Sequence, residues 1–406
     1  MITDDAVILG LLIATLGLVL WSASSPIPAF RAFYRYVPSL LLCYFIPALY
    51  NTFGLVDGEN SRLYFVASRY LLPATLVLLT IAIDIPAIVR LGPKALALFL
   101  TGTVGVILGG PIALMIVRAI SPDTITPETW RGLSAVAGSW IGGGANQAAM
   151  KDVFAIPNDL FGMMVAVDVL VANIWMAVLL WMAANSDRLD RAAGVDTAAL
   201  VALRERVERF EREHARIPTL TDLMAIVAVG FGLMGLSHLL GNPLAAWISE
   251  VAPHLDRYSL TSGFFWVVVL ATTFGLLSSF TPAKQLEGVG ASRVGQLLVY
   301  VLVATIGMQM NLGAVFTNPG LFLVGVIWIS FHAALMLIVA KLLRAPVFYL
   351  AVGSQANIGG AASAPVVAAA FHPALAPVGV LLAVLGYALG TYGGWLSGQL
   401  MRVASQ

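Results

Sequence analysis

Two glycine-rich polar stretches interrupt an otherwise apolar chain. The first, GSWIGGGANQAAMKD (138–152), places three glycines before an Asn-Gln pair, and the second, GSQANIGGAASAP (353–365), places two amides around a Gly-Gly pair. Each glycine costs a helix about 1 kcal/mol, so both stretches predict a broken helix. Inside a membrane, broken backbone is tolerated only within protein or beside a water-filled cavity. The half-helix ends and unwound carbonyls at such breaks bind anions and cations.

We expect the two stretches to form one site for a small polar solute that carries a carboxylate or a similar group. Glycines that only allow close helix packing are the alternative, and this reading fits GTVGVILGG (102–110) best. It does not account for adjacent glycines beside Asn and Gln in two places. The predicted solute-binding residues are Ser139, Gly142, Gly143, Gly144, Asn146, Gln147, Ser354, Gln355, Asn357, Gly359, Gly360 and Ser363.

Asp168 is the strongest candidate for binding a coupling ion. It lies inside the apolar run FGMMVAVDVLVANIW, where ionisable residues are costly and mark functional sites by default. Bound Na⁺ or a proton would relieve that cost, and a structural hydrogen bond to a neighbouring helix is the alternative. The predicted cation-coupling residues are Asp168, Asn146, Asn173 and Thr391.

Other ionisable residues give weaker signals. Lys151 and Asp152 are equally compatible with a site pair and with the wet end of a half-helix. Asp84 lies at the end of its apolar run and is expected at the interface. Arg69 lies a few residues into its run, so snorkelling to the interface is the first reading and pairing with a substrate carboxylate the second.

Composition assigns the chain to the integral membrane proteins. Of 406 residues, 59% are hydrophobic and 11% charged, whereas soluble domains carry about 25% charged residues. The net charge of +1 gives no indication of nucleic-acid binding. The single cysteine, Cys43, and five histidines without ligand spacing predict no metal site, no catalytic residue and no enzyme activity. We expect no cofactor beyond Na⁺ or H⁺ as coupling ion.

The elements that position these residues are apolar runs of about 20 residues, the length of a membrane-spanning helix. The first predicted span stays attached, because Asp4 and Asp5 precede it where a signal peptide carries positive charge. Two glycine-broken segments, 127–156 and 345–372, lie between the fourth and fifth spans of each half. The ten predicted spans are 6–24, 36–55, 64–83, 94–117, 160–183, 220–240, 263–280, 294–310, 320–341 and 375–400.

Each broken segment is long enough for one crossing or for a re-entrant hairpin. Re-entrant hairpins place the basic loops on one side and agree better with the positive-inside rule, so we prefer them. Five crossings per half then predict an all-α polytopic fold of two inverted repeats, 1–184 and 219–406. Between them, the Arg- and Glu-rich linker 185–218 reads equally well as an amphipathic surface helix or a solvated connector.

The segments SRYLLPATLVLLTIAIDIPAIVRLGPKALALFLTGTVGVILGG, GSWIGGGANQAAM and VAVDVLVANIWMAVLLW resemble the domain-of-unknown-function family 819 of bacterial and plastid membrane proteins. Its most specific marks are Ile141, Gly142, Gly143, Asn146 and the following Asp168. Gly144 departs from the small hydroxyl residue often found there, which leaves open whether Ser139 supplies that contact.

By resemblance, this family belongs to the cation/proton antiporters and anion symporters, with the sodium/glutamate and sodium/citrate symporters as relatives. The resemblance implies paired broken helices in an inverted repeat, sodium or proton coupling, elevator-type movement and homodimers.

The sequence therefore predicts a secondary active transporter in the inner (cytoplasmic) membrane, with lipid and a small polar solute as its partners. We expect Na⁺- or H⁺-coupled symport of a small organic anion such as an amino acid or a carboxylate. The alternatives are a Na⁺/H⁺ antiporter without organic substrate, an intramembrane enzyme and a passive channel.

Overall fold

The computed structural model describes the chain except residues 35–36, 38, 59, 195–217, 311–317 and 373–374. Its described residues form helices, and their only β pairing is an isolated bridge between Ile2 and Val56. Most of the predicted linker 185–218 lies outside the described residues; its start forms α10 (Ser186–Ala192).

Seven helical segments of the described chain are long and apolar enough to cross a membrane, and up to nine if two bent pairs each count as one span. The seven are α1 (Asp5–Ser24), the continuous segment Leu63–Ile81, α7 (Pro93–Ile120), α9 (Asn158–Ala184), α12 (Leu220–Val251), α15 (Gly320–Leu342) and α18 (Ala376–Ala404). The segment Leu63–Ile81 consists of α4 (Leu63–Val66), the π-helix η1 (Ala67–Leu71) and α5 (Leu72–Ile81).

The other predicted spans are shorter helices. They are α3 (Ser39–Thr52), α13 (Gly263–Ser278) and α14 (Ala291–Gly307). The helix α2 (Pro28–Tyr34) precedes α3 at a bend of 88°, and η4 (Pro282–Val289) follows α13 at a bend of 94°. A helix α6 (Ile85–Arg90) leads into α7. The prediction of a helical, multi-pass membrane protein is confirmed.

The first broken segment is a re-entrant hairpin within α8 (Thr129–Val153). The rings of Trp130 and Phe154, at its two ends, lie 5.4 Å apart. A straight helix would separate residues this far apart in sequence by about 36 Å. The chain therefore reverses inside α8 and returns to the end at which it entered.

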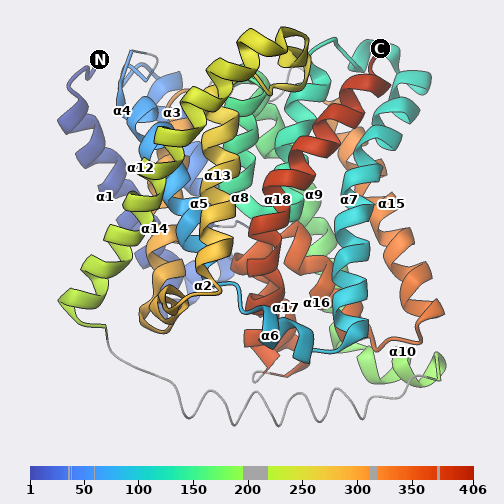
Figure 1. Ribbon diagram of the computed structural model, residues 1–406. Coiled ribbons are helices and arrows are strands. Elements are labelled where there is room, and N and C mark those ends of the chain that lie inside the picture. Colours follow the sequence, from blue (N-terminus) through green and yellow to red (C-terminus); the bar gives the residue numbers. More distant parts are fainter. Residues whose placement is uncertain (35–36, 38, 59, 195–217, 311–317, 373–374) are drawn as a thin grey trace.

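The second broken segment reverses in the same manner between α16 (Val347–Ile358) and α17 (Gly360–Phe371). Phe348 at the start of α16 and Phe371 at the end of α17 bring their rings to 5.3 Å. Both segments therefore have the geometry of a hairpin, as the re-entrant reading expects, and neither is a single straight helix. Figure 1 shows α8 in the upper half of the molecule and α16 and α17 in the lower half, so the hairpins enter from opposite ends.

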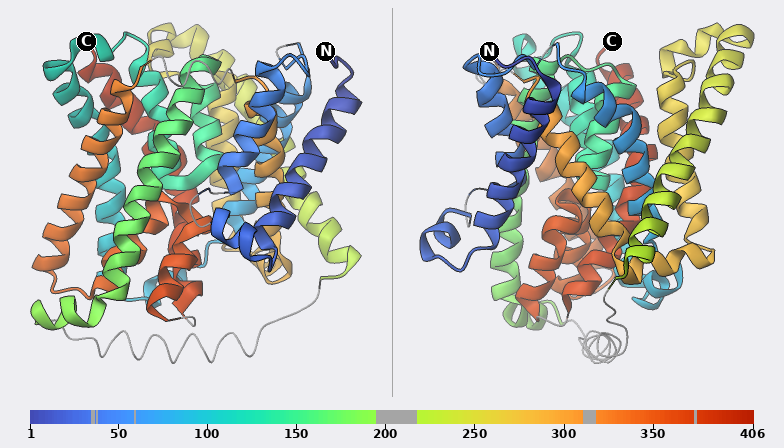
Figure 2. Two further views of the ribbon diagram at one scale, coloured as in Figure 1. Left: turned by 180° about the vertical axis from the view of Figure 1, so that it is seen from behind. Right: turned by 90° about the vertical axis from the view of Figure 1, so that its left-hand side faces the viewer.

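The buried apolar residues form two main clusters that meet at α8, α9 and α18. One cluster joins α7, α9, α15, α16 and α17, and the other joins α1, α3, α5, α13 and α14. Helix α12 packs on α5 and α13. In the side view of Figure 2, α1 and α12 lie on opposite sides of the molecule. We call α7, α8, α9, α15, α16 and α17 the hairpin group, and α1, α3, α4, η1, α5, α12, α13 and α14 the flanking group.

Candidate functional site

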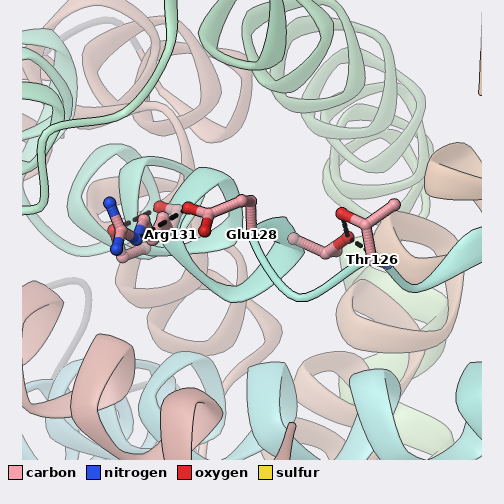
Figure 3. A network of polar contacts seen from close by, with 5 residues as sticks. Thr126, Glu128 and Arg131 are labelled. Carbon is pink, nitrogen blue, oxygen red and sulfur yellow. Dashed lines mark hydrogen bonds and ion pairs between the residues drawn. The ribbon is translucent and has the colours of Figure 1, made fainter.

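The first hairpin begins in a short polar turn. The Thr126 backbone N–H donates to Thr129 Oγ1 at 2.9 Å, and Arg131 Nε pairs with Glu128 Oε2 at 2.8 Å (Figure 3). This ion pair is partly exposed, and such pairs contribute at most about 1 kcal/mol to stability. These contacts set where the helix starts, and the site itself lies deeper, at the hairpin tip.

The tip of the first hairpin is at Gly143. Its backbone angles, φ 74° and ψ −172°, fall in a region that essentially only glycine adopts. The two arms then lie so close that a Cβ on Gly138 would come within 2.7 Å of the Asn146 carbonyl oxygen. Gly142 plays a packing role, because a Cβ there would meet Gly390 Cα of α18 at 2.8 Å. The glycines therefore both break the helix and allow close packing.

The tips of the two hairpins meet. Gly360 turns the second hairpin with φ +56°, and a Cβ on it would lie 3.8 Å from Gly143 Cα. Gly143, Gly144 and Gly359 are partly accessible, although the helical residues before each break are buried. The two glycine breaks are therefore brought to one partly accessible place inside the protein.

Asp168 on α9 faces the first hairpin and is held by three neutral donors. Its Oδ2 accepts from Ser139 Oγ and from Gln147 Nε2, each at 2.7 Å, and its Oδ1 accepts from Trp140 Nε1 at 2.6 Å. Within the part of the chain that the structure describes, it forms no ion pair. Hydrogen bonds to a carboxylate are about twice as strong as neutral ones, so this cage stabilises a buried negative charge without neutralising it.

The cage extends to the flanking group through a residue that the sequence did not single out. Tyr44 of α3 donates its hydroxyl to Gln147 Oε1 at 3.1 Å. Gln147 therefore connects Asp168 in the hairpin group to the flanking group, so that a displacement of α8 against α3 would alter the donors around Asp168.

Asn146 fastens the second arm of the first hairpin to α18. Its Nδ2 donates to the carbonyl oxygens of Gly142 at 2.9 Å and Tyr387 at 3.0 Å, and its Oδ1 accepts from Thr391 Oγ1 at 2.7 Å. Thr391 in turn shares a hydrogen bond of 2.9 Å with Thr272 of α13. Two of the predicted cation-coupling residues, Asn146 and Thr391, are therefore in direct contact.

Asn357 makes the same three kinds of contact in the second hairpin. Its Nδ2 donates to the carbonyls of Gly353 and Phe99, each at 2.9 Å, and its Oδ1 accepts from Thr103 Oγ1 at 2.8 Å. In both cases the partners are the carbonyl four residues back and a carbonyl–threonine pair spaced i, i+4 on a neighbouring helix. Asn146 follows its glycine break whereas Asn357 precedes its break, so the two sets match in bonding and differ in chain order.

The second hairpin also carries a buried histidine network. Trp175 Nε1 donates to Ser354 Oγ at 2.8 Å, and Ser354 Oγ lies 2.8 Å from His332 Nε2. His332 Nδ1 lies 3.1 Å from the Gly102 carbonyl oxygen and must donate to it, so Nε2 of a neutral ring accepts from Ser354. This arrangement accounts for Gly102, where a Cβ would come within 3.3 Å of the imidazole.

One polar atom at the second tip has no hydrogen-bond partner in the described part of the chain. Gln355 Nε2 donates to Ser363 Oγ at 2.6 Å across the hairpin, while the buried Gln355 Oε1 has no hydrogen-bond partner among the described residues. Such an acceptor next to the accessible glycines is suited to a donor on a bound solute.

The structure does not bring all of the predicted residues together. Asn173 is the one that stays apart: it is partly exposed, and its amide donates to the Val169 carbonyl of its own helix at 2.6 Å. Ser139 does supply a hydroxyl contact next to the first break, namely the one to Asp168. Tyr44, Trp140, Thr103, Trp175 and His332 take part without having been predicted, and their aromatic or β-branched types gave no distinguishing signal in an apolar chain.

These features define a class: polytopic helical membrane proteins with two re-entrant hairpins whose tips meet inside the protein. The chain belongs to the family described as "Protein of unknown function (DUF819)", whose model matches residues 10–404. It is also similar to the "Uncharacterized membrane protein YjcL" of Bacillus subtilis (strain 168), with 25% identity over 366 residues, 86% of each chain.

Proposed function

We propose that this protein is a secondary active transporter that couples Na⁺ or H⁺ to the symport of a small organic anion, such as an amino acid or a carboxylate. The observation that carries the proposal is the meeting of two glycine tips, Gly143 and Gly360, inside a membrane protein. Non-helical backbone at this depth is stable only where it lines a cavity or is buried in protein.

The coupling ion is proposed to act at Asp168. Three neutral donors hold the carboxylate in place, and no cationic side chain of the described residues pairs with it. A buried carboxylate of this kind is costly, and a bound cation or proton lowers the cost. The solute is proposed to lie at the tips, where Gln355 Oε1 is available as an acceptor.

Movement is proposed to follow the elevator type, in which the hairpin group slides against the flanking group. The division of the buried apolar residues into two clusters, which meet at α8, α9 and α18, supports two groups of helices that move relative to each other. The matched contacts of Asn146 and Asn357, and the opposite entry of the two hairpins, support an inverted repeat with five spans and one re-entrant hairpin in each half.

The remaining properties follow from this proposal and from the family resemblance. We propose a homodimer in the inner (cytoplasmic) membrane, with no enzymatic activity and no cofactor besides the coupling ion. The anion-symporter and antiporter grouping of the family is part of the same proposal.

Thermal stability of the purified protein tests the proposal. Amino acids, dicarboxylates and small peptides are each added with and without Na⁺ at two pH values. A ligand at 100 times its Kd stabilises the native state by about 2.7 kcal/mol. The expected result is a stabilisation by one solute class that requires Na⁺ or acid pH and disappears in Asp168→Asn.

The matched control is Asp84→Asn, which removes a carboxylate that pairs with Lys284 at 3.1 Å at a partly exposed position. This variant should keep the solute response. A change in thermal stability with Na⁺ or pH alone, with no effect of any solute, would favour an ion antiporter over the symporter. Solute flux in proteoliposomes that ignores every ion gradient would instead indicate a passive channel.

A further inference from the structure

A second cluster of charged side chains lies one helical turn from Asp168, between the first hairpin and the flanking group. Lys151 follows Gln147 by four residues, so the two share a face of the second arm. Gln147 contacts Asp168 and Tyr44, while Lys151 Nζ donates to the Tyr64 hydroxyl of α4 at 3.1 Å. The cluster is therefore on the same face as the Asp168 cage, about 6 Å further along the hairpin arm.

The hairpin side of the cluster contains one cation and one carboxylate. Lys151 is 5% exposed, and its ammonium lies 4.2 Å from the centre of the Tyr64 ring. Asp152 Oδ1 accepts from the Tyr64 hydroxyl at 2.8 Å. The other carboxylate oxygen, Asp152 Oδ2, is buried and has no hydrogen-bond partner among the described residues.

The flanking side contributes Arg69. It lies in the π-helix η1, a rare conformation found frequently at functional sites. His238 Nε2 lies 2.8 Å from the Arg69 carbonyl oxygen, and the guanidinium stacks 4.1 Å from the centre of the Phe264 ring. Arg69 Nη1 is buried and has no hydrogen-bond partner in the described part of the chain.

The π-helix η1, which carries Arg69, packs against α4, which carries Tyr64, and against α8, which carries Lys151 and Asp152. Arg69 nevertheless forms no ion pair with Asp152 in the described structure. The cluster therefore presents a positively charged donor and a negatively charged acceptor, both without a hydrogen-bond partner among the described residues. The net formal charge of Arg69, Lys151 and Asp152 is +1. Burying such groups without partners is costly, and more so when they are charged.

We infer that Arg69, Lys151 and Asp152 form an outer binding site for a small carboxylate that carries a neighbouring hydrogen-bond donor, either a hydroxyl or an ammonium group. Arg69 and Lys151 bind the carboxylate, and Asp152 Oδ2 accepts from the donor. This inference deepens the proposed transport function, on which it rests, by naming a substrate class: 2-hydroxy or 2-amino carboxylates rather than plain carboxylates.

Four probes of similar size test this inference on the full-length protein in nanodiscs: lactate, alanine, propionate and propylamine. Binding is measured by calorimetric titration. A hydrogen bond to a charged group contributes about 1.5–3 kcal/mol, which corresponds to roughly 10- to 150-fold in Kd. Lactate or alanine should therefore bind at least about 10-fold more tightly than propionate, and propylamine should not bind. The better of lactate and alanine identifies whether the donor is a hydroxyl or an ammonium group.

Three variants assign the binding to this cluster. Arg69→Gln should weaken all three carboxylates by about 10-fold or more, and Asp152→Asn should remove most of the preference over propionate while keeping carboxylate binding. Lys284→Gln, which removes a partly exposed lysine paired with Asp84, should bind as the wild type does. Size-exclusion profiles check folding, and Arg69→Lys replaces Arg69→Gln if the latter aggregates.

The outcomes separate this inference from the transport proposal. Unchanged binding of all probes in Arg69→Gln or Arg69→Lys and in Asp152→Asn, or no preference over propionate in the wild type, overturns the outer site even if proteoliposomes accumulate solute. Binding that responds to both substitutions supports the outer site even if no ion gradient drives flux, and in that case the transport proposal fails alone.

Discussion

Two buried tryptophans that touch each other allow a direct measurement of the charge on Asp168. Trp140 and Trp328 are both fully buried, and their ring centres lie 5.1 Å apart. Trp140 Nε1 donates to the Asp168 carboxylate at 2.6 Å, whereas Trp328 Nε1 donates to the Val106 carbonyl at 2.9 Å. Replacing either by phenylalanine removes one N–H donor and a similar volume, so the two variants differ mainly in the charge of the acceptor.

The expected difference follows from the strengths of the two bonds. A hydrogen bond to a charged group contributes about 1.5–3 kcal/mol and a neutral one about 0.5–1.5 kcal/mol. Trp140→Phe should therefore lose about 1–2 kcal/mol more unfolding free energy than Trp328→Phe, because the cavity cost is common to both.

The assay is reversible unfolding in mixed micelles at increasing denaturing detergent, followed by circular dichroism, with and without Na⁺. Trp140→Phe should lose less unfolding free energy relative to Trp328→Phe when Na⁺ is present, because a bound cation compensates the charge of the carboxylate. Equal losses in the two variants under all conditions would show that Asp168 is neutral in the folded protein, and would refute the reasoning that places a cation there.

Three further predictions concern the hairpins and their supports. Gly143→Ala should destabilise the protein by about 1–3 kcal/mol, because its backbone angles exclude other residues; thermal unfolding should show little change for Gly144→Ala, whose new Cβ would make only an ordinary 3.6 Å contact. Asn357→Ala should cost about 2–4 kcal/mol because it leaves buried hydrogen-bond partners unsatisfied, whereas Asn173→Ala, which loses one partly exposed bond within its helix, should cost under about 1 kcal/mol. A similar loss in both asparagine variants would contradict the network. Burial raises the pKa of the Asp190 carboxyl, which accepts from the first backbone N–H of α16 at 2.9 Å. Its contribution to stability is therefore full below the unfolded pKa of about 3.9 and is lost as pH rises through the folded pKa. The melting temperature of Asp190→Asn minus that of the wild type should therefore increase from acidic to neutral pH. A difference that does not change with pH would contradict the raised pKa of Asp190.

The sequence by itself determined the class of the protein and the places where its helices break. Low charge and long apolar runs require a membrane environment because such a chain cannot cover a water-facing surface. Glycine clusters break helices through a local backbone effect, so the stretches around Gly143 and Gly360 were found without any knowledge of the fold. Asp168 stood out for the same kind of reason, since a carboxylate in an apolar run is costly wherever the run lies.

The sequence left open how the broken segments run. A glycine break is compatible with a full crossing and with a reversal, and the positive-inside pattern gave only a preference. The reversal is visible in the contacts that join the ends of each hairpin, such as the 5.3 Å approach of Phe348 to Phe371. These aromatic residues look like ordinary lipid-facing or core positions in the sequence, so their pairing could not be read from it.

Tertiary structure alone decided which side chains surround the candidate site. Tyr44 reaches Gln147 across 103 residues, and Thr391 reaches Asn146 across 245. No periodicity links positions so far apart, which is why Asn173 was placed in the predicted cation site although it bonds within its own helix. The local chemistry of glycine, amide and carboxylate marked where a site would form, whereas packing between distant helices determined which donors hold it, because hydrogen bonds form between neighbours in space.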